Sequence, residues 1–205
     1  MIKNISKSIY MLSKGKILKP SFILDKPLII GVTGHRELCI TELPYYREQI
    51  RNFLIALLQI NRNIVIYSSL TDGADRLIVQ EGIQLNISFI AVLPLNISLY
   101  SNDFNVASMI EFETLLLKAD RIKIMPVLNN SNNGKISVYG PARDKQYERA
   151  GRYVVNKSKV ILAVWDGEHT GLTGGTSETI KYCMKKKVLD LYCLPVKRNI
   201  TIRNK

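Results

Sequence analysis

Apolar residues follow two alternating patterns along this chain. The first is a short continuous run, as in Val160–Trp165, which is typical of a strand buried on both faces. The second recurs every three or four positions, as over residues 50–58, and predicts an amphipathic helix. Runs of the first kind predict strands over residues 28–32, 64–68, 87–93, 121–127, 160–165 and 188–194. Segments of the second kind predict helices over residues 44–60, 74–84, 106–118, 143–157 and 175–186.

This alternation of strands and helices predicts the α/β fold class. Because the strand segments are continuously apolar, both faces of the sheet must be covered by helices. We therefore expect a single Rossmann-like, doubly wound, mostly parallel sheet of about six strands with helices on both faces. In such sheets ligands bind beyond the carboxyl ends of the strands, near the point where the strand order reverses. The residues that directly follow each strand are thus the first candidates for a site.

The length of 205 residues suits one well-buried domain. We expect that domain over residues 25–195, preceded by a basic arm over residues 1–24 and followed by a basic tail over residues 196–205. The Asn-rich stretch over residues 129–134 predicts a mobile loop within the domain.

The formal net charge of +12 is concentrated at the two ends of the chain. Residues 1–20 hold five lysines and no acids, and residues 181–205 hold eight basic residues against Asp190 alone. Residues 21–180 hold sixteen basic and sixteen acidic residues. Basic ends can attach to nucleic acid in a salt-dependent way, but a neutral middle argues against nucleic-acid binding as the main function.

The three cysteines show no paired metal spacing, and the chain has only two histidines. We expect no metal site, and an odd cysteine count without a secretion signal favours a reducing cytoplasm. No apolar run reaches the roughly 18–20 residues of a membrane-spanning helix, so we expect no membrane partner.

The most informative segment follows the fifth predicted strand. Asp166 ends that strand, and Gly174-Gly175-Thr176-Ser177-Glu178 opens the next helix. A helix N-terminus preceded by glycines is an anion site, because its first backbone N–H groups have no helical partner. Glu178 is better suited to a sugar hydroxyl or to chemistry at a sugar carbon than to a phosphate. The segment therefore predicts a phosphorylated, sugar-bearing ligand, and no other cofactor is required.

Polar residues also follow the first two predicted strands. Gly31, Thr33, Gly34, His35 and Arg36 form a turn that allows close backbone approach and offers a guanidinium for phosphate. The turn is neither Gly-x-Gly-x-x-Gly nor a Walker loop, which disfavours classical dinucleotide and P-loop sites.

After the second strand, the candidates are hydroxyl, glycine and charged residues before a helix: Ser69, Asp72, Gly73, Asp75 and Arg76. Asp72 is also a natural N-cap.

Three further candidates follow the third and fourth strands. Tyr100, among short polar residues, has a side chain suited to covering a base or a ribose, or to anchoring an ordinary loop. Arg143 and Tyr147 lie one helical turn apart on the same face, suited to a phosphate contact and to base stacking. The alternative for this pair is a solvated basic helix face.

In this order, the motifs resemble the SLOG superfamily over residues 27–194. That superfamily comprises Rossmann-like domains related to the Lonely Guy phosphoribohydrolases and to the DNA-processing protein of natural transformation. The resemblance rests on five ordered segments: Gly31–Arg36, Ser69–Arg76, Leu93-Pro94 with Tyr100 and Asp103-Phe104, Arg143 with Tyr147 and Gly151, and Ala163–Gly167 with Gly174–Glu178.

The resemblance implies two kinds of activity. Lonely Guy enzymes cleave the N-glycosidic bond of nucleoside monophosphates through a Pro-Gly-Gly-x-Gly-Thr-x-x-Glu signature. Here Glu178 stands one position closer to Thr176, and the proline is missing. Other members, often in bacterial defence, are sensors of nucleotide-derived signals such as cyclic ADP-ribose isomers. Relatives are often oligomers, so the resemblance also implies self-association, and a sensor would act through an oligomer or a separate effector protein.

We therefore rank three functions. The first is binding or sensing of a phosphorylated, ribose-containing, ADP-ribose-like molecule by the candidate residues. The second is N-glycosidic hydrolysis of nucleoside 5′-monophosphates, with Glu178 and Asp166 as catalytic carboxylates. The third is nucleic-acid binding through the basic ends.

Overall fold

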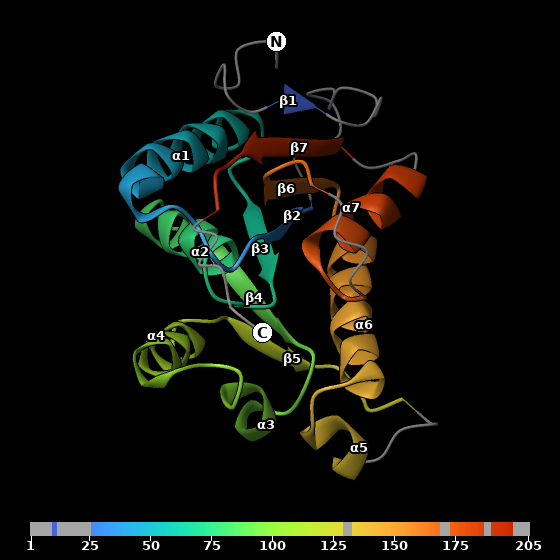
Figure 1. Cartoon of the computed structure of the whole chain (residues 1–205). Coiled ribbons are helices and arrows are strands. Elements are labelled where there is room, and N and C mark those ends of the chain that lie inside the picture. Colours follow the sequence, from blue (N-terminus) through green and yellow to red (C-terminus); the bar gives the residue numbers. More distant parts are fainter. Residues whose placement is uncertain (1–9, 12–25, 129–132, 169–172, 187–189, 199–205) are drawn as a thin grey trace.

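The computed structural model describes residues 10–11, 26–128, 133–168, 173–186 and 190–198, and nearly all of them belong to one sheet and its covering helices (Figure 1). The sheet has the strand order β1-β7-β6-β2-β3-β4-β5. Its members are β1 Tyr10–Met11, β2 Leu28–Gly34, β3 Ile64–Ser68, β4 Ser88–Leu93, β5 Arg121–Ile124, β6 Val160–Trp165 and β7 Asp190–Pro195. β2 to β7 run parallel, and β1 pairs antiparallel with β7.

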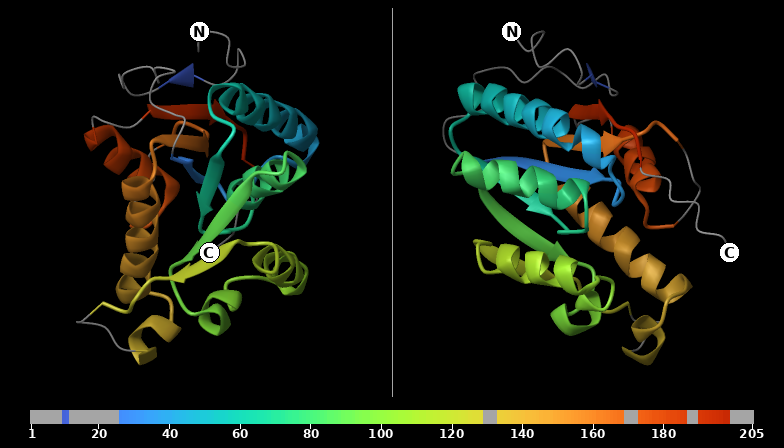
Figure 2. Two further views of the ribbon diagram at one scale, coloured as in Figure 1. Left: turned by 180° about the vertical axis from the view of Figure 1, so that it is seen from behind. Right: turned by 60° about the vertical axis from the view of Figure 1, so that its left-hand side comes forward.

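Helices cover both faces of this sheet, as the two views of Figure 2 show. One face carries α1 Leu43–Ile60, α2 Ala74–Gln84 and α4 Val106–Leu116, and the other carries α6 Pro141–Lys157 and α7 Thr176–Lys185. Short elements connect them: a 3-10 turn over Ile40–Glu42, α3 Ile97–Ser101 and α5 Asn133–Ser137. The predicted α/β, doubly wound fold with a mostly parallel sheet is confirmed.

Strand β6 shows why a continuous apolar run predicts a strand in this fold. All six of its residues are buried. Val160, Leu162 and Val164 pack into the core under α1 and α2, whereas Ile161, Ala163 and Trp165 pack against α6 and α7. Successive side chains point to opposite faces of a strand, so a strand with two covered faces needs apolar residues at every position.

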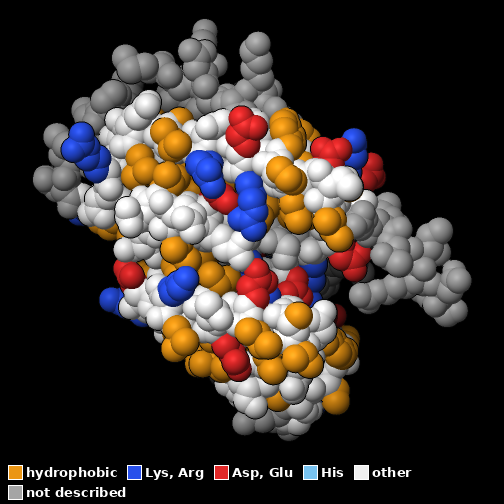
Figure 3. All heavy atoms as spheres, turned by 90° about the vertical axis from the view of Figure 1, so that its left-hand side faces the viewer, with side chains coloured by type: hydrophobic (Ala, Val, Ile, Leu, Met, Phe, Trp, Pro, Cys, Tyr) orange, Lys and Arg blue, Asp and Glu red, His pale blue; other side chains and the backbone are white. Residues whose placement is uncertain are grey.

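The outer surface of α1, α2 and α4 mixes charged and apolar side chains (Figure 3). Arg47 and Arg51 of α1 each lie 2.7 Å from the buried carboxylate of Glu81 on α2. No helix in the described part of the chain is long and apolar enough to cross a membrane.

The structure adds detail at the two ends of the chain. The two residues of β1 lie inside the segment predicted as a basic arm, and residues 196–198 of the predicted tail contact the domain. The rest of the arm, the rest of the tail and residues 129–132 of the predicted loop lie outside the described residues, whereas residues 133–134 begin α5.

The strand order reverses between β2 and β6, and these two strands pair from Ile30 with Val160 to Gly34 with Val164. Gly34 lies so close to its neighbours that no side chain fits there. A Cβ at this position would lie 2.3 Å from Ala74 Cβ and 2.6 Å from the carbonyl oxygen of Val164. The first residue of α2 can therefore approach the end of β2 only because residue 34 is glycine.

Substitution of Gly34 by alanine is expected to lower the free energy of unfolding by about 2 kcal/mol or more, since backbone must shift to admit the methyl group. Urea denaturation measures this change. The matched control is Gly151→Ala in α6, where the nearest atom to a new Cβ is the Thr179 side-chain oxygen at 3.0 Å. There the gain in helix propensity offsets a small adjustment, so we expect a change below about 1 kcal/mol. Equal losses in the two variants would contradict this account.

Candidate functional site

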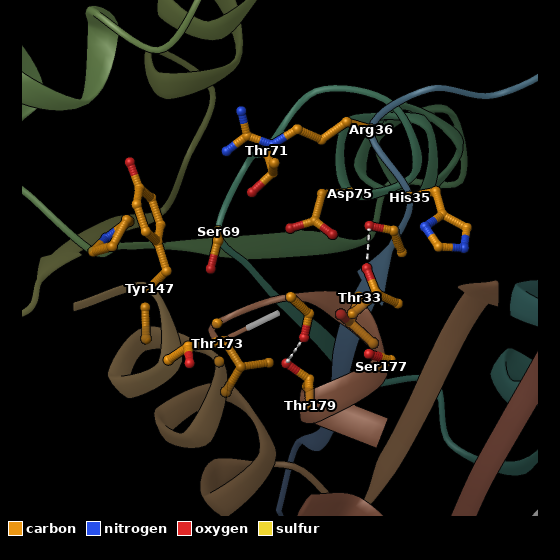
Figure 4. A pocket seen from close by; sticks show the side chains of 18 of the residues that line it. Thr33, His35, Arg36, Ser69, Thr71, Asp75, Tyr147, Thr173, Ser177 and Thr179 are labelled. Carbon is orange, nitrogen blue, oxygen red and sulfur yellow. Dashed lines mark hydrogen bonds between the residues drawn. The ribbon is translucent and has the colours of Figure 1, made fainter. Parts of the chain in front are cut away.

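A cavity of about 570 Å³ opens at the carboxyl ends of the strands, beside the reversal between β2 and β6. Its wall combines the turn after β2, the loop after β3, the α6 helix and the N-terminus of α7 (Figure 4). Its volume lies in the range of small-molecule sites, about 300–1,000 Å³. The position is the one that the doubly wound topology assigns to a ligand.

The turn after β2 supplies a histidine and an arginine. His35 Nε2 lies 2.7 Å from Asp166 Oδ1, at the end of β6. Arg36 is half-exposed, and its Nη2 lies 4.0 Å from Asp103 Oδ2. Arg36 is thus loosely held at the cavity, whereas the histidine ring is fixed across the two central strands.

Burial and hydrogen bonding determine the charges of the His35–Asp166 pair. Burial lowers the pKa of His35 from its usual 6.5, although Asp166 acts in the opposite direction. Burial by itself would raise the pKa of Asp166, but hydrogen bonds from the Glu168 backbone N–H and from His35 hold it below its usual value. At neutral pH the imidazole is therefore neutral and donates its Nε2 proton to the ionised carboxylate.

Asp75 brings a buried carboxyl group to the same cavity. Its side chain comes from the first turn of α2, and the residue is 5% exposed. Burial raises the pKa of Asp75 to about 7, against hydrogen bonds from Ser68 and from the backbone N–H groups of Ser69 and Thr71. Asp75 thus changes between donor and charged acceptor near neutral pH.

The N-terminus of α7 closes the opposite wall of the cavity. Gly174 has a φ of +77°, and a Cβ there would lie 2.8 Å from the Asp144 carbonyl oxygen on α6. Thr176 donates a hydrogen bond of 2.8 Å from its hydroxyl to the Gly34 carbonyl oxygen. This contact joins the glycine turn after β2 to the helix terminus, so both parts of the predicted phosphate site face one cavity.

Glu178 does not line this cavity. Its carboxylate accepts a hydrogen bond of 3.3 Å from the backbone N–H of Gly174, the residue that precedes the N-cap Gly175 of α7. Glu178 instead borders a second cavity of about 230 Å³ together with basic residues of α6 and α7, among them Arg152 and Lys181. Asp166 lies behind His35 and does not line the main cavity either. The catalytic roles expected for these two carboxylates stay predictions.

Arg76 is buried and holds internal contacts. Its Nε donates to the Leu70 carbonyl oxygen at 2.9 Å, and its Nη1 contacts Ser108, Asp72 and Glu111. Asp72 also accepts a hydrogen bond from the Ser108 hydroxyl. These contacts join the loop after β3 to α4.

Arg143 is also buried, 2% exposed, and its guanidinium lies away from the cavity lining. Its Nη1 donates to the Ile136 carbonyl oxygen at 2.6 Å, and its Nη2 donates to Leu99 at 3.0 Å and to Asp103 at 2.6 Å. Tyr147 donates its hydroxyl to the same Asp103, and the Tyr147 side chain lines the cavity. Arg143 therefore makes structural contacts, whereas Tyr147 forms part of the cavity wall.

The candidate residues separate into two sets. The cavity is lined by Thr33, Gly34, His35, Arg36, Ser69, Asp75, Tyr147, Gly174, Gly175 and Thr176. The residues outside its lining are Gly31, Asp72, Gly73, Arg76, Tyr100, Arg143, Asp166 and Glu178. Tyr100, for example, is fully buried and donates its hydroxyl to the Ser69 carbonyl oxygen at 3.1 Å. Residues of the second set support those of the first, and a ligand role for either set remains a prediction.

Several lining residues were missed by reasoning from the sequence. They include Thr71, Tyr139, Thr173, Ser177, Thr179 and Arg198. Thr71 and Ser177 belong to motifs already singled out, and Thr173 directly precedes Gly174, so their hydroxyls were a usable signal. Tyr139 lies in none of these motifs. Arg198 follows the predicted strand over residues 188–194 by four positions, but it falls in the segment predicted as a basic tail.

Of the comparisons with known proteins, only the comparison of structures gives a match. No family model matches the sequence, and no curated protein matches it. The structure is similar to the X-ray structure of DNA processing protein A (DprA) from Streptococcus pneumoniae, with a TM-score of 0.53 and 13% sequence identity. The match covers 80% of this chain and 49% of that chain, so the chain spans about half the length of that protein. The Rossmann-like fold that the sequence predicts is thereby confirmed.

Proposed function

We propose that this protein binds a nucleotide-derived small molecule that contains phosphate and ribose, such as an ADP-ribose-like signal. The cavity of about 570 Å³ beside the β2–β6 reversal carries this proposal. It brings together the glycine turn, the helix N-terminus and the loop after β3, which are far apart in the sequence. Single loops of this kind are common as structural turns, but their convergence on one cavity is typical of a ligand site.

The phosphate is assigned to the side of the cavity formed by Gly34 and the start of α7. Backbone N–H groups at a helix N-terminus stabilise negative charge, and Gly174 and Gly175 leave the backbone accessible. Arg36 adds a guanidinium at the rim, where its partner Asp103 is 4.0 Å away. An arginine with so loose a contact can turn toward a phosphate at small cost.

The ribose and the base are assigned to the remaining walls. Hydroxyl groups of Thr33, Ser69 and Thr71 and the carboxyl of Asp75 face the cavity and match the hydroxyls of a sugar (Figure 4). The aromatic rings of Tyr139 and Tyr147 also line it. The hydrogen bond from Tyr147 to Asp103 keeps its ring fixed, which suits stacking against a flat base.

Hydrolysis of an N-glycosidic bond ranks below binding. The hydrolase hypothesis relies on Glu178 at a sugar carbon, and this carboxylate borders the second cavity and accepts a hydrogen bond from the Gly174 backbone N–H. A sensor would pass its signal through a second copy of the chain or a separate effector protein, and both partners remain predictions.

Calorimetry with AMP, ADP, ADP-ribose, cyclic ADP-ribose and adenosine tests the proposal. We expect at least one phosphorylated member to bind with a dissociation constant below 1 mM. Arg36→Ala should weaken that binding by about tenfold or more, because a charge-assisted hydrogen bond contributes about 1.5–3 kcal/mol. Arg62→Ala, an exposed arginine between α1 and β3, is the matched control and should leave the affinity unchanged.

Failure of the whole panel to bind below 1 mM would refute the proposal. Chromatography of the same mixtures detects free base, and its release would favour hydrolysis over sensing. If Glu178→Gln then abolished the release, the hydrolase hypothesis would replace ours.

The affinity for an anionic ligand should fall as the pH rises from 6.5 to 8. The Asp75 carboxyl lines the cavity and its pKa lies at about 7, so it ionises across this range and then repels a phosphate. Binding of the anion favours the protonated form, which means that binding takes up a proton and weakens at higher pH. Asp75→Asn should flatten this dependence when titrations are run with ADP-ribose. A wild-type affinity that rises with pH would contradict this assignment.

A further inference from the structure

The chain beyond β7 lies against the domain near the cavity. The Val196 backbone N–H donates to the Trp165 carbonyl oxygen at 3.2 Å. The Lys197 carbonyl oxygen accepts a hydrogen bond of 3.1 Å from the Cys39 backbone N–H, and the Lys197 backbone N–H donates to the Tyr46 hydroxyl at 2.9 Å. Backbone contacts on both sides of Lys197 therefore fix the position from which the next residue extends.

Arg198 extends from this fixed position into the cavity wall. Its side chain is 29% exposed, and its Nε lies 2.5 Å from Asp166 Oδ2. This is a charge contact and not an aligned hydrogen bond, because the buried Nε makes no hydrogen bond to any described residue. Asp166 is therefore the partner of this nitrogen by charge attraction and not by an aligned hydrogen bond.

Few cationic side chains line the cavity, and Arg198 is one of them. Among the described lining residues, Arg36 and Arg198 are the two cations that are charged at neutral pH. The same lining holds the acidic residues Glu37, Asp75, Asp144 and Glu168. An anionic group can therefore be accommodated only near one of the two arginines or at the α7 N-terminus.

The geometry places Arg198 and the α7 N-terminus around the same turn. His35 contacts Asp166 at 2.7 Å, Asp166 contacts Arg198 at 2.5 Å, and Thr176 contacts Gly34, the neighbour of His35, at 2.8 Å. Arg198 is thus connected through two contacts to the turn where the phosphate is assigned.

We propose that Arg198 is the residue that distinguishes a phosphorylated ligand from its unphosphorylated nucleoside in this cavity. The inference rests on the proposed function and deepens it. Asp166 holds the guanidinium at the cavity edge through a charge contact at Nε. Two parallel N–H groups of an arginine match the geometry of two phosphate oxygens. The site therefore includes residues 196–198.

Calorimetry with ADP-ribose and with adenosine on three forms of the full chain tests this inference. Arg198→Ala should raise the dissociation constant for ADP-ribose by about 10- to 100-fold, as expected for a lost charge-assisted hydrogen bond. The same variant should bind adenosine within about threefold of wild type. Lys197→Ala is the matched control, because it removes an equal charge from the adjacent, largely exposed side chain. This variant should change neither affinity by more than about threefold, because salt in the buffer screens an exposed charge.

The outcomes separate the inference from the proposed function. If wild type binds ADP-ribose and Arg198→Ala binds it equally well, the inference is wrong and the proposed function stands. If Arg198→Ala weakens ADP-ribose and adenosine by the same factor, Arg198 has only a structural role and the inference is also wrong. If wild type binds no member of the nucleotide panel, both fail. Should Arg198→Ala lower the unfolding temperature, Arg198→Gln replaces it, and the same ratio of the two affinities decides.

Discussion

The close parallel pairing of β2 and β6 is the constraint on which the rest of this structure depends. At its carboxyl end, Gly34 has no room for a side chain between Ala74 and Val164. The same point receives the Thr176 hydroxyl from α7 and passes directly into His35, which contacts Asp166 at the end of β6. Strand pairing, helix placement and the cavity therefore meet at one glycine.

Polar residues around the cavity play two different parts. Arg76, Arg143 and Asp103 are almost fully buried and pair with each other or with backbone carbonyl groups. Breaking a buried pair leaves an uncompensated charge, so these residues hold the loops in place. Arg36 lies 4.0 Å from Asp103, Arg198 makes a charge contact with Asp166, and both arginines line the cavity. A site built in this way has a rigid wall and two cations that can respond to a ligand.

Asp75 and His35 set the charge of the site at neutral pH. Burial moves both groups toward their neutral forms, which raises the pKa of Asp75 to about 7 and lowers that of His35. The fixed positive charge of the cavity therefore comes from its two arginines and from the helix terminus. Because four acidic residues line the same cavity, these few cationic groups suit a ligand with few phosphates and several hydroxyls and argue against a long polyanion.

The sequence by itself determined the fold class, the six parallel strands and most of the cavity wall, because residues that follow parallel strands must meet at one sheet edge. It did not determine which arginines face the ligand. Arg143 and Arg76 have the right motif positions, but only tertiary packing shows that both are used by internal partners. Arg198 has no motif, because the contacts that fix it join Lys197 to Cys39 and Tyr46, more than 150 residues away. Such long-range backbone contacts leave no local pattern in a sequence, and only the folded chain reveals them.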